Sequence, residues 1–223
     1  MAGLTELVSI PGYLSRPQGN GLWPGVIVIH EWWGLGDQIR SVADRLAAAQ
    51  YLAFAPDLYR GELAPLGDSD KATVLVQKYG PGAPDELAQV FDALKSHPNC
   101  SGKVGIVGFC FGGRMALMLG LARPVDAVVT FYGGGMQQIF SRMGSFQAPA
   151  VLGFFGDQDI SIPAGTIAEF ERLLKGIDVE HEVITYPNSG HAFFRDTDPA
   201  SYRPEAASDA WERLLRFFGQ HLS

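Results

Sequence analysis

Short runs of apolar residues alternate with amphipathic stretches along this chain of 223 residues. The apolar runs are rich in β-branched and aromatic residues, as in strands that are buried on both faces of a sheet. Between them, apolar residues recur every three or four positions, the spacing of one helix face. The pattern predicts strands over residues 25–30, 52–56, 103–107, 126–131, 150–155 and 180–186, and helices over residues 38–50, 85–96, 111–121, 163–174 and 204–218, with Gly219 as the final stop signal.

The repeated order of strand, helix and strand predicts the fold class. Right-handed crossovers turn this order into a mainly parallel, doubly wound α/β sheet with helices on both faces, a three-layer sandwich. No repeat or linker divides the sequence, so we expect residues 1–223 to form one domain. Ligands of such sheets bind at the carboxyl ends of the strands. Residues 60–82 are rich in Gly, Pro and Asp and are expected to form a loop or lid over a site.

The composition argues against several classes of protein. With 47% hydrophobic and 18% charged residues it is ordinary for a globular protein, and a net charge of −7 argues against a nucleic-acid partner. No apolar run is long enough to cross a membrane and no signal peptide is recognisable, so we expect no membrane partner and a cytoplasmic location. The two cysteines, Cys100 and Cys110, are then not expected to form a disulfide, and no ligand spacing suggests a metal site.

The strongest chemical signal is the run Gly108-Phe-Cys-Phe-Gly112 between a predicted strand and a predicted helix. It fits G-x-C-x-G, the cysteine version of the nucleophile elbow, whose glycines let the backbone turn without a clash. Cys110 would lie at a helix N-terminus, which favours a thiolate, and the Phe111 N–H would face a developing oxyanion. The alternatives are a structural cysteine in a Gly-rich turn and a nucleotide-binding loop, although the run lacks both glycine-rich phosphate motifs.

A thiol nucleophile needs a base and a group that orients the base. In α/β-hydrolases the chain order is nucleophile, acid, histidine. His191 lies in a loop after the last predicted strand, whereas the other histidines after Cys110 fall in a strand and at the C-terminus. Asp159 follows the preceding strand and is favoured as the acid, because Asp157 is better placed to cap the turn. The alternative is that both aspartates only shape the loop.

The loop after the first long strand carries two further candidates. It commonly supplies the second oxyanion donor in this fold, here the Trp32 N–H. Glu31 follows an apolar strand, and a carboxylate in that position is either paired or functional. It could hold the thiol proton of Cys110, or form an ion pair with Arg114 or Arg40. The residues alone leave both possibilities open.

Several segments together resemble the dienelactone hydrolases (carboxymethylenebutenolidases), which have the α/β-hydrolase fold. The resemblance extends over nearly the whole chain, and its specific part is the cysteine elbow combined with an upstream glutamate. The matching segments are His30-Glu-Trp-Trp-Gly34, Pro56-Asp-Leu-Tyr59, Gly105-Ile-Val-Gly-Phe-Cys-Phe-Gly-Gly113, Phe131-Tyr-Gly133, Gly156-Asp-Gln-Asp159 and Gly190-His-Ala-Phe193.

The resemblance implies a Cys110–His191–Asp159 triad and an acyl-enzyme. It also implies that Glu31 interacts with Cys110 and helps to convert the thiol to a thiolate when substrate binds. Family members hydrolyse dienelactones to maleylacetate without a cofactor and hold the substrate carboxylate with two arginines. Arg195, four residues after His191, matches one of these arginines.

The second arginine of the family has no evident counterpart. No arginine lies between Arg60 and Arg114, and the substitutes in that interval are lysines. A lysine is a point charge rather than a bidentate fork. The sequence therefore predicts the type of reaction more firmly than the substrate.

The remaining expectations concern the pocket and its partners. Trp32, Trp33 and Tyr132 are candidates for its apolar walls, although they could equally be core residues. The expected partner is a small ester or lactone, anionic if Arg195 binds it, and the chain is expected to be a monomer or a weak homo-oligomer. The alternatives are a broader carboxylesterase or thioesterase, a non-catalytic binding module, and a redox-sensing cysteine. A sensor would need a resolving thiol, and Cys100 is expected at the opposite end of the sheet.

Overall fold

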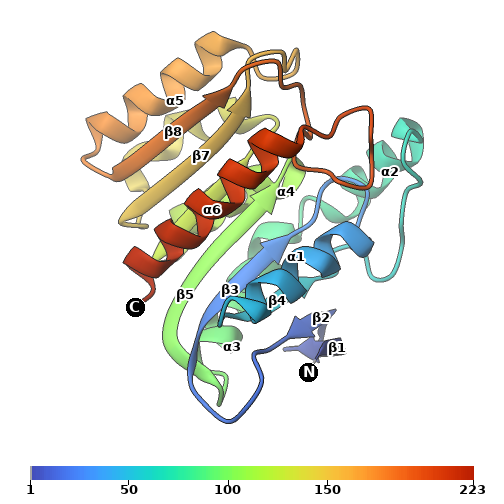
Figure 1. The fold of residues 1–223 in the computed structure, drawn as a ribbon, viewed down its shortest axis with the longest axis vertical. Coiled ribbons are helices and arrows are strands. Elements are labelled where there is room, and N and C mark those ends of the chain that lie inside the picture. The colour runs from blue at the N-terminus through green and yellow to red at the C-terminus, as the bar shows by residue number, and fades with distance from the viewer. Residues whose placement is uncertain (1) are drawn as a thin grey trace.

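The computed structural model describes residues 2–223, which build one eight-stranded sheet flanked by helices (Figure 1). The strand order is β1-β2-β4-β3-β5-β6-β7-β8, and every pair from β4 to β8 is parallel. The mainly parallel α/β fold is therefore confirmed. The strands are β1 (Ala2–Leu7), β2 (Ile10–Ser15), β3 (Trp23–Ile29), β4 (Leu52–Pro56), β5 (Cys100–Phe109), β6 (Ala127–Phe131), β7 (Ala150–Gly156) and β8 (Glu180–Tyr186).

Helices cover both faces of the sheet. In Figure 1, α1 and α6 pass in front of the strands, and α3 and α4 lie behind them. This arrangement is the predicted three-layer sandwich. The helices are α1 (Asp37–Ala48), α2 (Ser69–Tyr79), α3 (Ala83–Lys95), α4 (Phe111–Ala122), the 3-10 helix η1 (Met136–Ser145), α5 (Ala164–Gly176) and α6 (Pro204–His221).

The apolar runs form the centre of the sheet. Every residue of β4, β6 and β7 is buried, and so are five consecutive residues of β3, from Gly25 to Ile29. Continuous apolar sequence is what a parallel strand covered on both faces requires. Because these strands are parallel, the loops that follow β3, β5, β7 and β8 meet at one edge of the sheet, where the candidate catalytic residues of the sequence lie.

Three details of the sequence prediction were wrong or incomplete. The antiparallel strands β1 and β2 were not predicted, because β1 is exposed on both faces and has no apolar period. The segment 60–82 is not only loop, since it contains α2, whose N-terminus is capped by Asp68. This helix buries only Ala72 and Leu75, which gives a weak pattern. Finally, Gly219 does not end α6, which continues to His221.

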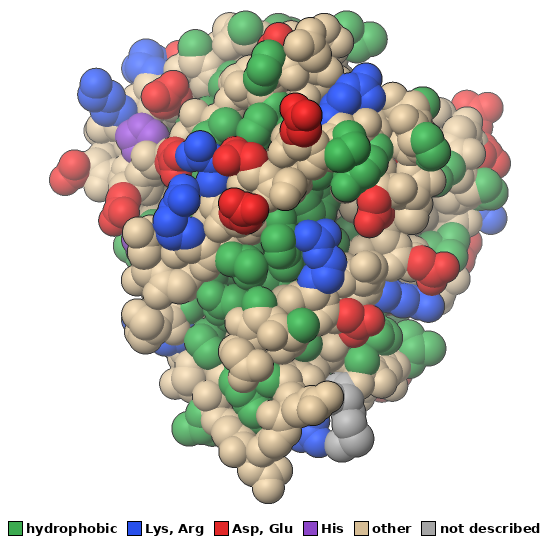
Figure 2. Space-filling model, viewed as in Figure 1, with side chains coloured by type: hydrophobic (Ala, Val, Ile, Leu, Met, Phe, Trp, Pro, Cys, Tyr) green, Lys and Arg blue, Asp and Glu red, His purple; other side chains and the backbone are tan. Residues whose placement is uncertain are grey.

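Charged side chains are spread over the visible face of the molecule (Figure 2). On the face drawn in Figure 2, acidic and basic side chains are interspersed and neither sign forms a continuous patch. Within residues 2–223 no helix combines the length and the apolar composition that a membrane crossing requires.

Candidate active site

The turn from β5 into α4 places Cys110 at the N-cap of the helix. Its backbone has φ 54° and ψ −112°, a conformation that L-residues rarely adopt. The Cys110 N–H donates a hydrogen bond of 3.0 Å to the Phe131 carbonyl, which ties the turn to β6. A Cβ on Gly108 would overlap the Gly112 carbonyl, and a Cβ on Gly112 would overlap the Ile29 carbonyl. The two glycines of the motif are therefore a steric requirement of this turn.

This requirement gives a stability prediction for Gly108→Ala. The added methyl group has no space to move into, because the atoms that it meets belong to the backbone of α4. We expect the free energy of unfolding to fall by about 3 kcal/mol, the upper part of the overpacking range. Urea denaturation measures this change. Gly219→Ala is the matched control, since its Cβ meets nothing within 4 Å, and it should leave stability unchanged or slightly higher. Equal stability of both variants would contradict this account of the turn.

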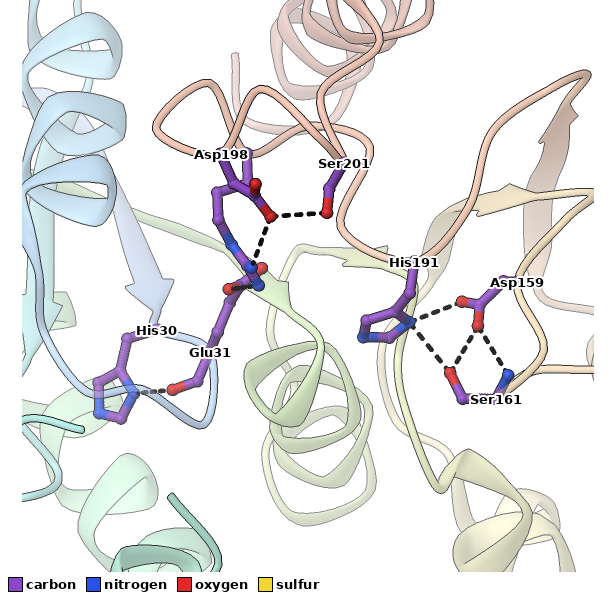
Figure 3. Close-up of polar contacts among 8 residues, drawn as sticks. His30, Glu31, Asp159, Ser161, His191, Asp198 and Ser201 are labelled. Carbon is purple, nitrogen blue, oxygen red and sulfur yellow. Dashed lines mark hydrogen bonds and ion pairs between the residues drawn. The ribbon is translucent and has the colours of Figure 1, made fainter. Parts of the chain in front are cut away.

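The loops after β7 and β8 bring together an acid, a histidine and a serine (Figure 3). His191 Nδ1 lies 2.6 Å from Asp159 Oδ2. Asp159 Oδ1 accepts hydrogen bonds from Ser161 Oγ at 2.5 Å and from the Ser161 N–H at 2.9 Å. Ser161 Oγ also lies 3.2 Å from His191 Nδ1. The buried carboxylate is thus held from two sides and directed at the imidazole.

The electrostatics of this cluster favour an imidazolium at His191 once Cys110 is a thiolate. Burial lowers the pKa of His191, but hydrogen bonds to Asp159 and Cys110 and the negative charges of both groups raise that pKa to about 10. Burial raises the pKa of Asp159, and its hydrogen bonds to His191 and Ser161 outweigh this effect, so that the pKa lies below its usual value. Asp157, the rejected alternative, accepts a hydrogen bond from the Ser189 N–H instead and shapes the loop.

Two backbone N–H groups beside Cys110 have no hydrogen-bond acceptor within residues 2–223, those of Phe111 and Trp32. The peptide group that carries the Trp32 N–H is held at its carbonyl oxygen, which belongs to Glu31. His30 Nδ1 lies 2.5 Å from the Glu31 carbonyl oxygen, which belongs to the same peptide unit. The Gly34 N–H donates to the same oxygen at 3.2 Å. The carbonyl and the N–H of a planar trans peptide point in opposite directions, so His30 and Gly34 together fix the direction of the Trp32 N–H.

Glu31 is paired, but with neither of the arginines considered in the sequence analysis. Its carboxylate forms a close ion pair with Arg195, which also lies 3.7 Å from Asp198 (Figure 3). Arg40 lies 3.8 Å from Asp37 instead, and no carboxylate within residues 2–223 is bonded to Arg114. The alternative that Glu31 pairs with Arg114 or Arg40 was therefore wrong, because Glu31 turns toward the loop that follows His191.

A cavity of about 490 Å³ opens beside the thiol. Trp32 and Trp33 line it, as expected, and Val76 places α2 at its wall, so part of the segment 60–82 covers the site. Tyr132 does not line it, and the expectation of a substrate-facing wall was wrong for this residue. Its side chain is fully buried, and its ring centroid lies 5.1 Å from that of His191. Other lining residues are Cys110, Phe111, Arg114, Ser161, His191 and Arg195.

Three polar residues that line the cavity were not predicted as such from the sequence: Ser161, Ser201 and Arg114. Ser161 had a local signal, since a serine two residues after an aspartate often bonds back to that carboxylate. Arg114 follows Cys110 by four positions, and such residues share a helix face. Within residues 2–223 no three Asp, Glu, His or Cys side chains are grouped as metal ligands. Cys100 begins β5 and Cys110 follows its end, roughly 30 Å away at the rise of a strand, too far to resolve an oxidised Cys110.

The chain has a nucleophile elbow between a strand and a helix. An acid and a histidine follow it along the chain, on loops at the same edge of the sheet. This arrangement defines an α/β-hydrolase. The sequence model of the dienelactone hydrolase family matches residues 10–222. The chain belongs to this family, and it is a carboxylic ester hydrolase.

Individual relatives agree with this assignment. A protein of Yersinia pestis provisionally named carboxymethylenebutenolidase is 35% identical over 95% of this chain and 84% of its own length. A crystal structure from Klebsiella pneumoniae, provisionally named dienelactone hydrolase, matches with a TM-score of 0.84 at 32% identity and covers 99% of this chain and 98% of that chain. A dienelactone hydrolase-like promiscuous phosphotriesterase from metagenomic libraries has a TM-score of 0.86 at 24% identity, over 100% of this chain and 99% of that chain, and supports the fold alone.

Proposed function

We propose that this protein hydrolyses a carboxylic ester or lactone of the dienelactone type through a Cys110–His191–Asp159 triad and a thioester intermediate. The proposal rests on one observation: an oriented histidine, a thiol and two free N–H groups lie together at one cavity. His191 is bonded to Asp159 on one side and lies within hydrogen-bonding reach of Cys110 on the other. Both groups border the same cavity as two N–H groups without acceptors.

The first half-reaction forms the acyl-enzyme. His191 Nδ1 is engaged by Asp159, which leaves Nε2 to take the thiol proton of Cys110. The thiolate attacks the carbonyl carbon and forms a C–S bond, while the Phe111 and Trp32 N–H groups hold the oxyanion. The tetrahedral intermediate collapses, the C–O bond breaks, and the leaving enolate oxygen takes the proton from His191, which returns the imidazole to its neutral form.

The second half-reaction reverses these roles. His191 removes a proton from water, and the resulting hydroxide attacks the thioester carbonyl. The C–S bond breaks, Cys110 regains a proton from His191, and the carboxylic acid leaves. With a lactone substrate both carboxylic acid and enol belong to one product, which for a dienelactone is maleylacetate.

Glu31 has a role in this proposal through its pairing. In the resting structure the carboxylate is held by Arg195. We propose that it reaches Cys110 only after this pair opens, and that an anionic substrate competing for Arg195 opens it. Glu31 then assists the change of Cys110 from thiol to thiolate.

The substrate class is tested by turnover of a dienelactone, of simple aryl and alkyl esters and of thioesters. A dienelactone preferred by kcat/KM supports the proposed substrate, whereas equal use of neutral esters favours a broader carboxylesterase. No turnover of any of these compounds would contradict the proposed function and would favour a binding module.

The oxyanion site gives a further prediction at His30. His30→Leu removes the shorter of the two hydrogen bonds that hold the Glu31–Trp32 peptide and leaves the one from the Gly34 N–H. We expect kcat to fall by about 30-fold with little change in KM, less than the loss of a whole oxyanion donor. His30→Asn, whose amide nitrogen can replace Nδ1 as donor, should retain most activity. Alkylation of Cys110 by iodoacetamide forms no oxyanion and should proceed at the wild-type rate in both variants. If His30→Leu slowed alkylation as much as hydrolysis, the residue would act on general folding instead.

A further inference from the structure

Arg114 lies in the catalytic cavity one turn of α4 beyond Cys110. Residues four positions apart share a helix face and are separated by about 6 Å along the helix axis. The wall between them has no side chains. A Cβ built on Gly134 would lie 3.9 Å from Cys110 Sγ, and one built on Gly135 would lie 2.7 Å from Arg114 Nη1. The two glycines therefore let the backbone of this wall approach both the sulfur and the guanidinium closely, and a side chain at position 135 would collide with the guanidinium.

The other charged groups at this cavity are already compensated. Arg195 is bound to Glu31 and lies near Asp198, and His191 is bound to Asp159. The carboxylates of Glu31 and Asp159 are thus already paired with Arg195 and His191. An anionic ligand that approached Arg195 would have to compete with Glu31 for it.

Arg114 has no such partner. Within residues 2–223 no carboxylate pairs with it, and its Nε is buried without a hydrogen bond. Its nearest aromatic contact is the Phe111 ring, 5.9 Å from the guanidinium carbon. Cys110 and Tyr59 face it. The sulfur supplies a negative charge only as a thiolate and loses it when it bonds to an acyl group, and burial raises the pKa of the Tyr59 phenol and keeps it neutral. A guanidinium stays charged in proteins, and a half-buried one without a counter-ion is costly unless a ligand supplies the negative charge.

We propose that Arg114 is a specificity-determining residue that binds a carboxylate of the substrate a few bonds from the scissile carbonyl. The inference deepens the proposed function, since it takes Cys110 as the nucleophile. It replaces the missing second arginine with a residue from the elbow helix itself. The planar fork of the guanidinium suits a carboxylate, and the short distance from Cys110 restricts the anion to small acyl or leaving groups.

Alkylation of Cys110 tests the subsite without ester hydrolysis. Iodoacetate and iodoacetamide both transfer a two-carbon group to sulfur with loss of iodide, and they differ in carrying a carboxylate or a neutral amide. We expect Arg114→Gln to lower the iodoacetate-to-iodoacetamide rate ratio at Cys110 by about 10-fold, the worth of one charge-assisted hydrogen bond. Arg114→Lys should give an intermediate ratio. Arg123→Gln removes the same charge from the end of α4, where Arg123 pairs with Asp92, and should leave the ratio unchanged.

Ester hydrolysis provides the second arm. A 4-nitrophenyl hemisuccinate carries a carboxylate on its acyl group, and 4-nitrophenyl butyrate is its neutral counterpart. In Arg114→Gln the KM for the hemisuccinate should rise by about 10-fold, while the constants for the butyrate stay within about two-fold. An unchanged alkylation ratio, or an equal loss with both esters, would overturn the role of Arg114. If the wild type hydrolysed neither of these esters nor a dienelactone, the proposed function would fail, and the alkylation ratio would still decide the question of Arg114.

Discussion

Cys110→Ala should lose nearly all hydrolysis of carboxylic esters, with kcat falling by about 10⁵-fold, as for the loss of a nucleophile from a catalytic triad. The reason is that the sulfur forms the bond to the acyl group. Without it, the two N–H groups can still polarise a carbonyl, but only water is left to attack. Steady-state assays on an aryl ester measure the effect.

Two further variants make the Cys110 result specific. Cys100→Ala removes the other thiol, which lies at the start of β5, and should leave kcat unchanged. Cys110→Ser keeps a nucleophile of similar size but with a far higher pKa, and tests whether the arrangement of Glu31 is suited to a thiol. Full activity in Cys110→Ala would show that another group attacks the ester.

Asp159→Asn should have the second largest effect, a fall in kcat of about 10³-fold. The amide keeps the shape of the carboxylate but removes its charge and disturbs the hydrogen bond to His191 Nδ1, which is 2.6 Å long in the wild type. The pKa of His191, about 10 in the wild type, should then fall, because Asp159 supplies the first of the hydrogen bonds that raise it. The pH dependence of Cys110 alkylation measures this change, with an alkaline limb that moves to lower pH.

Asp157→Asn is the matched control for this prediction. Asp157 lies two residues earlier in the same loop and accepts a hydrogen bond from the Ser189 N–H at 3.3 Å, which an asparagine oxygen can also accept. We expect kcat within about two-fold of the wild type, as for a substitution outside the catalytic groups. A larger loss for Asp157→Asn than for Asp159→Asn would reverse the assignment of the acid.

The sequence predicted those parts of the fold whose cause is local. The buried run before His30 could only be a strand covered on both faces. The glycines at positions 108 and 112 predicted the tight turn because no side chain fits there. β1 escaped prediction because its residues are exposed and pair with β2 only through the backbone.

The pairing of charges in the site could not be predicted, because it joins distant parts of the chain. Glu31 and Arg195 are separated by 164 positions, and only the fold brings them into contact. Tyr132 was misplaced for a related reason. Its side chain is fully buried beside the catalytic histidine and does not line the cavity. Residue type indicated which groups could react, but their partners depended on tertiary packing.

The central claim is that Cys110 carries the acyl group during turnover. Mixing the protein with an aryl ester, stopping the reaction with acid during the first turnover and mapping peptides by mass spectrometry tests it directly. The account predicts a mass increase equal to the acyl group on the peptide that contains Cys110, released by neutral hydroxylamine as a thioester is, and absent in Cys110→Ala. An acyl group on Ser161 or on another hydroxyl, with Cys110 unmodified, would contradict it.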